Sequence, residues 1–406
     1  MCDKGCDKGA FHPAKAGRAS SDRQADRSVA LGGIALHDIL ERGRNNFDLV
    51  RLLAAASVIL SHSFLIVSGL DSAEPLSGVS VFTLGQHAVC VFFVLSGLLV
   101  AASLERNPEP SAFFAGRVLR VFPGLIVCVL FVDLVLGPAV SHLDLSAYFT
   151  SPQTWRYLLV TLSLSTGHGM LPGVFEQLPA GGDVNVSLWT LKYEMGCYML
   201  LALLAALGLW RRPVLMWLGF AALVGVHLLR LTEVSVSQFG VFDHILRLSI
   251  CFFIGAGAYR LRHRLRLSLP GAVVAVCAYL ALWRTPAEAL ASYFAVGYLA
   301  LCFSALPLGG LRRLCARADL SYGIYIYGWP VGQTLLLCAP GLGPIELAVL
   351  SLLVAGSLAA VSWTLVEKPA LALKRRLPAG AAGTRPEIPS VLPLTGERNG
   401  NYCPRP

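Results

Sequence analysis

Long apolar runs dominate the pattern of this chain, and polar or basic connections separate them. Each run is about 17 to 23 residues long, which is the length a helix needs to cross roughly 30 Å of hydrocarbon. The pattern predicts membrane-spanning helices at 47–68, 84–104, 118–140, 188–209, 213–232, 244–260, 268–284, 289–307, 320–338 and 345–366. The predicted fold is therefore all-α, a polytopic membrane helix bundle of about ten transmembrane helices.

The composition agrees with a protein that lives in lipid. Hydrophobic residues make up 55% of the chain and charged residues only 14%, whereas about a quarter of a soluble globule is charged. The net charge of +9 would suit a nucleic-acid partner, but the basic residues stand in short clusters between apolar runs, as loop charges do. We expect membrane lipids as partners and no nucleic acid.

The basic clusters also predict the orientation, because cytoplasmic loops carry an excess of Arg and Lys. With the N-terminal tail inside, every second connection is arginine-rich and both termini are cytoplasmic. The outer connections hold Arg156 and Arg284 near span ends. The inner clusters are Arg42 and Arg44; Arg106, Arg117 and Arg120; Arg211 and Arg212; Arg260, Arg262, Arg264 and Arg266; Arg312, Arg313 and Arg317; and Lys374, Arg375 and Arg376.

The domain organisation follows from these boundaries. Residues 46–376 form the predicted membrane domain, between a polar tail at 1–45 and a Pro- and Gly-rich tail at 377–406, both expected to be disordered and cytoplasmic. The first tail carries the repeat CDKGCDKG. The outer segment 141–187 contains WRYLLVTLSLSTG, which we interpret as a re-entrant or interfacial helix, because another crossing would invert every later loop.

Cysteine usage gives no sign of a metal site. Most of the eleven cysteines stand singly inside apolar runs, as Cys90, Cys128 and Cys251 do. None is closely spaced with histidines in the way a structural zinc site requires. We expect no metal and interpret these cysteines as small packing residues.

The first span, FDLVRLLAAASVILSHSFLIV, carries three ionisable residues. Such residues are costly in hydrocarbon and usually face a bundle interior or a functional site. Asp48 lies one turn from Arg51 and can pair with it, while Arg51 and His62 share a helix face about 16 Å apart. The alternatives are a core histidine bonded to a carbonyl and an arginine that anchors the span at the interface.

The second and third spans add small and basic residues. Ser96 and Gly97 form a small-residue patch that lets another helix approach, and His87 lies near the outer end, where water can satisfy it. Arg117 and Arg120, one turn apart, could clamp a phosphate through bidentate hydrogen bonds. Anchoring of the span by positive charge explains one such arginine easily and the pair less well.

The fourth predicted span contributes a carboxylate. Glu194 in SLWTLKYE lies about 9 Å inside the outer boundary, at a depth similar to that of His62. An acid and a histidine at matched depth could form a proton-transfer pair. Lys192 could instead neutralise Glu194, and the residues alone leave both interpretations open.

Taken in order, five motifs resemble the membrane acyltransferase 3 family over about residues 45–376. They are Arg51-x10-His62; FFVLSG at 92–97; Arg117 and Arg120 before Pro123; SLWTLKYE with Trp189 and Glu194; and SYGIYIYGWP with Tyr322. The stretch LPGVFEQLPAGGDVNVSLWTLKYE is most similar to the branch that acetylates bacterial exopolysaccharide, lipopolysaccharide and related glycans.

The resemblance implies transfer of an acyl group, most simply acetyl, from cytoplasmic acyl-coenzyme A to a sugar hydroxyl at the outer face of the bacterial inner membrane. His62 and Glu194 would be catalytic, Arg51, Arg117 and Arg120 would bind acyl-coenzyme A, and no tightly bound cofactor is needed. The supporting residues would be Asp48, His87, Ser96, Gly97, Trp189 and Tyr322.

Three positions depart from the pattern of that family. Many members have an acidic residue at the place of Cys90 and a histidine at the place of Gly328, and Gly116 replaces one arginine of the usual pair.

A transporter or flippase is the competing interpretation, in which the same charges line a solute or proton path, although the chain shows no internal repeat of the kind many transporters have. A catalytically inactive membrane scaffold is a third.

Overall fold

The computed structural model describes residues 33–40, 45–106, 109–165, 169–315 and 318–373. A helix lies at each of the ten predicted spans. The helices are α3 (Phe47–Ser68), α4 (Leu84–Arg106), α5 (Pro110–Phe131), α9 (Leu191–Ala206), α10 (Pro213–Glu233), α11 (Val241–Arg260), α12 (Leu269–Ala281), α13 (Glu288–Ser304), α15 (Ser321–Cys338) and α16 (Pro344–Ser362).

Two of these helices continue through π-helical turns. After α5 the chain passes through η2 (Val132–Leu136) into α6 (Gly137–Val140), and after α16 it passes through η6 (Trp363–Glu367) into α17 (Lys368–Leu373). By length and composition, six helical stretches of the described residues can cross a membrane: Phe47–Ser68, Leu84–Arg106, Pro110–Val140, Pro213–Glu233, Val241–Arg260 and Pro344–Leu373. The chain is thus a helical multi-pass membrane protein, while the count of ten crossings and the sides of the termini stay predictions.

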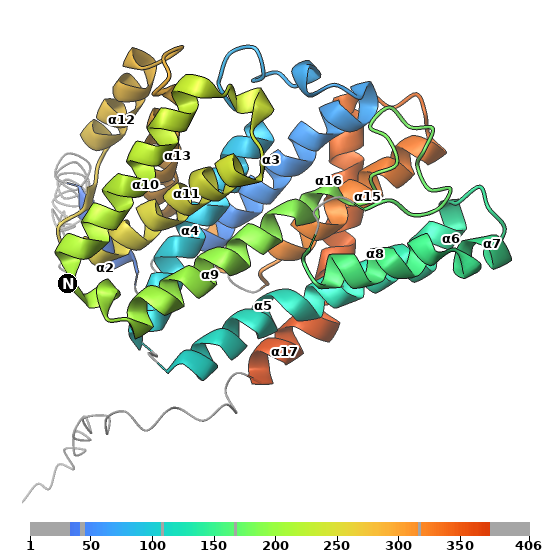
Figure 1. Ribbon diagram of the computed structural model, residues 1–406, viewed down its shortest axis with the longest axis horizontal. Coiled ribbons are helices and arrows are strands. Elements are labelled where there is room, and N and C mark those ends of the chain that lie inside the picture. The colour runs from blue at the N-terminus through green and yellow to red at the C-terminus, as the bar shows by residue number, and fades with distance from the viewer. Residues whose placement is uncertain (1–32, 41–44, 107–108, 166–168, 316–317, 374–406) are drawn as a thin grey trace, which may run out of the picture.

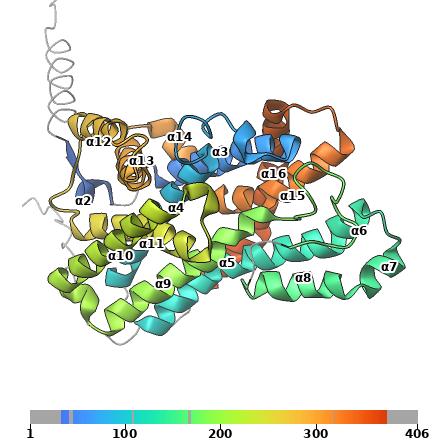
Figure 2. The same cartoon turned by 45° about the horizontal axis from the view of Figure 1, so that its top comes forward.

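The centre of the bundle is built from α3, α4 and α11 (Figure 1). In their most apolar stretches, 72% of the residues of α4 and 67% of those of α11 are buried, against 6% for α10. The views of Figures 1 and 2 agree that α10, α12 and α13 lie on one flank and that α15 and α16 lie on the other. Polar residues on α4 and α11 therefore face protein rather than lipid.

The crossing of α4 and α11 depends on two glycines. A methyl group on Gly97 would lie 1.8 Å from the carbonyl oxygen of Phe252, and one on Gly255 would lie 1.8 Å from that of Val94. The two backbones are in direct contact, as small residues permit between membrane helices. Gly97 thus contributes to packing, and its neighbour Ser96 faces another direction.

The outer segment contains short helices instead of another crossing. These are α7 (Leu145–Thr150) and α8 (Pro152–Leu162), followed by the 3-10 turn η3 (Val186–Thr190). At 11 residues, α8 is only about 16 Å long and cannot span the hydrocarbon. A re-entrant or interfacial position for this helix stays a prediction. The Tyr148 hydroxyl donates to the Asp133 carbonyl over 2.8 Å and ties this segment to η2.

Part of the predicted N-terminal tail is folded. Strand β1 (Ile34–Ala35) pairs antiparallel with β2 (Arg266–Leu267), and Leu36 in α2 (Leu36–Ile39) is fully buried. Burial of Leu36 and Ile39 holds this stretch, so order begins before residue 45. The repeat CDKGCDKG and residues 377–406 lie outside the described residues.

The remaining short elements are η1 (Asp71–Ala73), η4 (Leu209–Arg211), η5 (Val236–Gln238) and α14 (Gly309–Cys315).

The glycine crossing gives a stability prediction. We expect Gly97→Ala to lower the midpoint of thermal unfolding in detergent, because a methyl group there forces the two helices apart at a cost of about 1–3 kcal/mol. Gly225→Ala in α10 is the matched control, since nothing lies within 4 Å of a methyl group at that position. It should leave the midpoint unchanged or raise it. Equal effects of the two variants would contradict the crossing.

Candidate functional site

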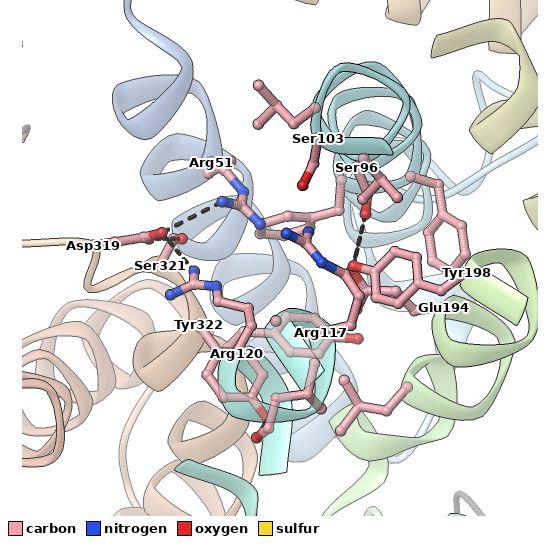
Figure 3. A pocket seen from close by; sticks show the side chains of 18 of the residues that line it. Arg51, Ser96, Ser103, Arg117, Arg120, Glu194, Tyr198, Asp319, Ser321 and Tyr322 are labelled. Carbon is pink, nitrogen blue, oxygen red and sulfur yellow. Dashed lines mark hydrogen bonds and ion pairs between the residues drawn. The ribbon is translucent and has the colours of Figure 1, made fainter. Parts of the chain in front are cut away.

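A cavity of about 380 Å³ opens between α3, α4, α5, α9 and α15 (Figure 3). Two carboxylates and four arginines line it, which leaves an excess of two positive charges, and polar and aromatic residues complete its wall. The charged residues are Glu194, Asp319, Arg51, Arg106, Arg117 and Arg120. A cavity with this balance favours an anionic ligand.

Asp319, between α14 and α15, joins two of the arginines. Its Oδ2 accepts from Arg51 Nη1 over 3.3 Å and also from Arg120 Nη2, while Ser321 Oγ donates to its Oδ1 over 2.6 Å. Burial raises the pKa of Asp319, but Arg120 and Arg51 outweigh that effect and lower the pKa to about 2. Asp319 is therefore ionised at every physiological pH and holds α3 and α5 together at the start of α15.

Arg117 and Arg120 share one face of α5, but their surroundings differ. Arg120 is bound to Asp319, whereas Arg117 forms no ion pair with any carboxylate of the described residues. The Arg117 guanidinium lies 5.8 Å from the ring centre of Tyr198 and 6.0 Å from that of Phe113, and its Nε is buried without a hydrogen-bond partner there. These aromatic contacts hold the Arg117 guanidinium in place, and no carboxylate in the described ranges neutralises its positive charge.

Glu194 anchors a second polar group in the cavity. Its Oε1 accepts from the Ser96 hydroxyl over 3.0 Å and from the Tyr198 hydroxyl, and the two hydroxyl oxygens are 2.9 Å apart. The Lys192 ammonium lies 5.1 Å from the Tyr193 ring centre and forms no ion pair with Glu194. The alternative in which Lys192 neutralises Glu194 is therefore wrong.

His62 lies outside the lining of this cavity. Its ring meets the Trp329 ring edge-on, with 5.0 Å between the ring centres. Tyr325 lines the cavity, and Trp329, against which His62 packs, is one helical turn further along the same face of α15. No hydrogen bond joins His62 and Glu194, because His62 faces α15 while Glu194 faces α4. The expected pair is not formed.

Asp48 and His87 also differ from the expectation. Arg51 forms its ion pair with Asp319 and not with Asp48, because Asp319 lies between two arginines. The Nε2 of His87 is 2.8 Å from Ser80 Oγ, and its ring packs edge-on against Phe82. Neither Asp48 nor His87 lines the cavity.

Trp189 and Tyr322 take different positions beside the cavity. The Trp189 ring packs against His244, with 4.7 Å between ring centres, and does not line the cavity. Tyr322 does line it, and its hydroxyl donates to the Val121 carbonyl over 2.8 Å. Tyr322 therefore ties α15 to α5, next to the Arg120 guanidinium above its ring.

Of the three atypical positions, Gly116 lines the cavity, whereas Cys90 and Gly328 lie at helix contacts away from it. Cys90 faces Arg247 of α11, a fully buried arginine that donates to Cys90 Sγ over 3.6 Å and to the Gln86 carbonyl over 2.7 Å. A methyl group on Gly328 would lie 2.7 Å from the side chain of Ile59. These positions serve the packing of α4 on α11 and of α15 on α3.

Several cavity residues escaped the sequence analysis. Asp319 is a lone acid at the entry of a span, and only its position just before SYGIY could have pointed to it. Tyr198 follows Glu194 by four residues, so helical periodicity places it on the same face. Arg106, Ser103 and Ser321 also line the cavity. Arg106 belongs to a basic cluster and Ser321 opens the SYGIYIYGWP motif, whereas no motif marks Ser103.

Comparisons with known proteins agree with one another. The family described as acyltransferase domain matches residues 44–366. Nodulation protein 10 of Rhizobium leguminosarum bv. viciae is 31% identical over 82% of this chain and 95% of that protein. An O-acetyl transferase of Shigella phage Sf6 is 28% identical over 80% of this chain and 95% of that protein. No solved structure matches the chain significantly.

The Asp319 ion pairs predict a pH-independent loss of stability. Asp319→Asn should lower the free energy of unfolding by about 3 kcal/mol, because two mostly buried arginines, whose side chains are 19 and 15% exposed, lose their counter-charge. Folding lowers the pKa of the Asp319 carboxyl group, so the ionised carboxylate stabilises the fold at every pH above about 4, the pKa of an aspartate in the unfolded chain. This stabilisation disappears as the pH falls through the folded-state pKa of about 2. Thermal unfolding at pH 5.5 and pH 8 should therefore show the same loss. Asp71→Asn, at an exposed carboxylate, is the control; a loss found at only one of the two pH values would contradict the assignment.

Proposed function

The chain belongs to the membrane acyltransferase 3 family, and from that membership and the arginine-lined cavity we infer the reaction. We propose that the protein moves an acyl group, acetyl, from acyl-coenzyme A to a hydroxyl of a glycan or lipid-linked sugar. The observation that carries the proposal is the cavity itself, with arginines near one end and the Glu194, Ser96 and Tyr198 group within it. The relative named O-acetyl transferase supports the choice of acetyl.

The donor would enter from the arginine-rich end of the bundle, which we assign to the cytoplasm of a bacterial inner membrane. Arg117 and Arg106 would bind coenzyme A phosphates, because among the described residues no carboxylate pairs with either. Arg guanidinium groups bind phosphate oxygens bidentately. Arg51 and Arg120 would contribute charge from beside Asp319. A cavity of about 380 Å³ is within the ordinary range for a small-molecule site.

The thioester would lie near the hydroxyls of Ser96 and Tyr198. Both hydroxyls donate to the carboxylate of Glu194, so Glu194 fixes their orientation. In this proposal Glu194 acts on the donor side of the reaction, rather than by orienting His62. The thioester is already activated, and the reaction needs no tightly bound cofactor.

The acceptor hydroxyl would reach the thioester from the outer side, where His62 lies. His62 would take the proton as the hydroxyl oxygen attacks the thioester carbonyl. The carbon–sulfur bond then breaks, the proton passes to the departing thiolate, and the products are the sugar ester and free coenzyme A. General-base assistance of this kind contributes a factor of about a hundred to ten thousand.

The donor site gives a binding prediction. Arg117→Ala combined with Arg106→Ala should weaken acetyl-coenzyme A binding by the purified protein at least roughly tenfold, because charged hydrogen bonds to phosphate are lost. Isothermal titration in detergent measures the change. Arg264→Gln, an exposed arginine outside the cavity, is the control. Unchanged binding by the double variant would return both arginines to an anchoring role.

The acceptor side gives a rate prediction. His62→Ala should lower the rate of acetyl transfer to a glycan by at least about a hundredfold and leave the affinity for acetyl-coenzyme A unchanged, because His62 lies outside the donor cavity. The assay follows thiol release together with the mass of the glycan. Wild-type transfer by a folded His62→Ala protein would refute the assignment. Solute movement without thiol release would favour the transporter hypothesis.

A further inference from the structure

A second cavity, of about 580 Å³, lies at the arginine-rich end of the bundle, where α4 and α9 end and α5 begins. Figures 1 and 2 both show the end of α9 close to the start of α5. Arg211, Arg260, Arg262 and His263 contribute its basic side. Leu104, Phe113, Ala202, Ala205 and Ala206 contribute apolar wall. The cavity therefore combines a cationic part with a hydrocarbon-like part.

The arginines of this cavity differ in their partners. Arg262 is neutralised, because its Nη2 and Nη1 donate to the two carboxylate oxygens of Glu105 over 2.8 and 3.4 Å. Arg260 donates to the Trp210 carbonyl over 2.7 Å, and its guanidinium lies 5.4 Å from the centre of the Trp210 ring. These contacts fix Arg260 without removing its charge. Neither Arg260 nor Arg211 forms an ion pair with a carboxylate of the described residues.

The apolar wall continues onto a surface suited to lipid. Ala202, Ala205 and Ala206 of α9 line the cavity, and Leu207, which directly follows α9, is 63% exposed. Small side chains there leave room for an acyl chain beside the helix. The cavity thus adjoins apolar surface at the same end as its cations, an arrangement that a free nucleotide does not require.

We infer that this cavity binds the headgroup of an anionic phospholipid. The phosphate lies between Arg260 and Arg211, and one acyl chain follows the alanines of α9. Basic pockets between membrane helices on the cytoplasmic side are known to select anionic headgroups, and the planar guanidinium suits a phosphate diester. Phe113, which lines this cavity, also lies beneath Arg117 of the donor cavity. A bound lipid therefore supports the wall that the two cavities share.

The experiment measures lipid retention by the purified full chain. Native mass spectrometry follows binding of phosphatidylglycerol and of phosphatidylcholine to the wild type and to Arg211→Gln combined with Arg260→Gln. We expect the wild type to prefer phosphatidylglycerol and the double variant to bind it roughly twentyfold more weakly, since each arginine near a headgroup contributes about a fivefold effect. Binding of phosphatidylcholine should not change.

Arg264→Gln is the matched control, because it removes the same charge from the same connection but lies outside the cavity. Equal weakening by Arg264→Gln would overturn the inference and indicate diffuse attraction to anionic lipid. Wild-type retention by the double variant would also overturn it. Displacement of phosphatidylglycerol by adenosine 3′,5′-bisphosphate would assign the cavity to a nucleotide instead. Thermal unfolding of each variant shows that it is folded.

Discussion

Asp319 is the residue on which the cavity depends, because it neutralises two arginines from different helices. Arg51 on α3 and Arg120 on α5 both bind Oδ2 of this carboxylate. Two guanidinium groups held this close inside a bundle would repel each other without an anion. Asp319 therefore allows the protein to keep both cations in the cavity wall. It does not neutralise Arg117, so the arginine beside Tyr198 keeps its positive charge.

The position of the hydroxyl groups follows from backbone packing. Gly97 lets α4 contact the backbone of α11 directly, and Ser96, the preceding residue, points about 100° away around the helix, where it meets Glu194 and Tyr198. The rigid crossing fixes the rotation of α4 about its axis. The position of the Ser96 hydroxyl in the cavity is thereby fixed by the helix contact that Gly97 makes.

The hydrophobic pattern predicts where the helices lie along the chain, but it does not predict which helices pack against one another. Helix periodicity gives the depth of a residue and its face. On this basis the sequence places Arg51, Arg117 and Arg120 at the donor end and Glu194 beside His62 in the outer half, whereas the cavity brings Glu194 together with the three arginines. It does not say which helices are adjacent. His62 and Glu194 were matched in depth, yet one faces Trp329 and the other Ser96. Asp319 escaped notice because its importance comes from partners 199 and 268 residues away.

The role of each arginine at this end of the bundle depends on whether a carboxylate neutralises it. Arg120 and Arg262 are paired with Asp319 and Glu105 and serve the architecture. Arg117 and Arg260 are held by aromatic rings, which orient a guanidinium without cancelling its charge. A count of basic residues treats all four alike, as the positive-inside rule does. The distinction comes from the partners, and it is the basis on which the two proposals give Arg117 a donor phosphate and Arg260 a lipid phosphate.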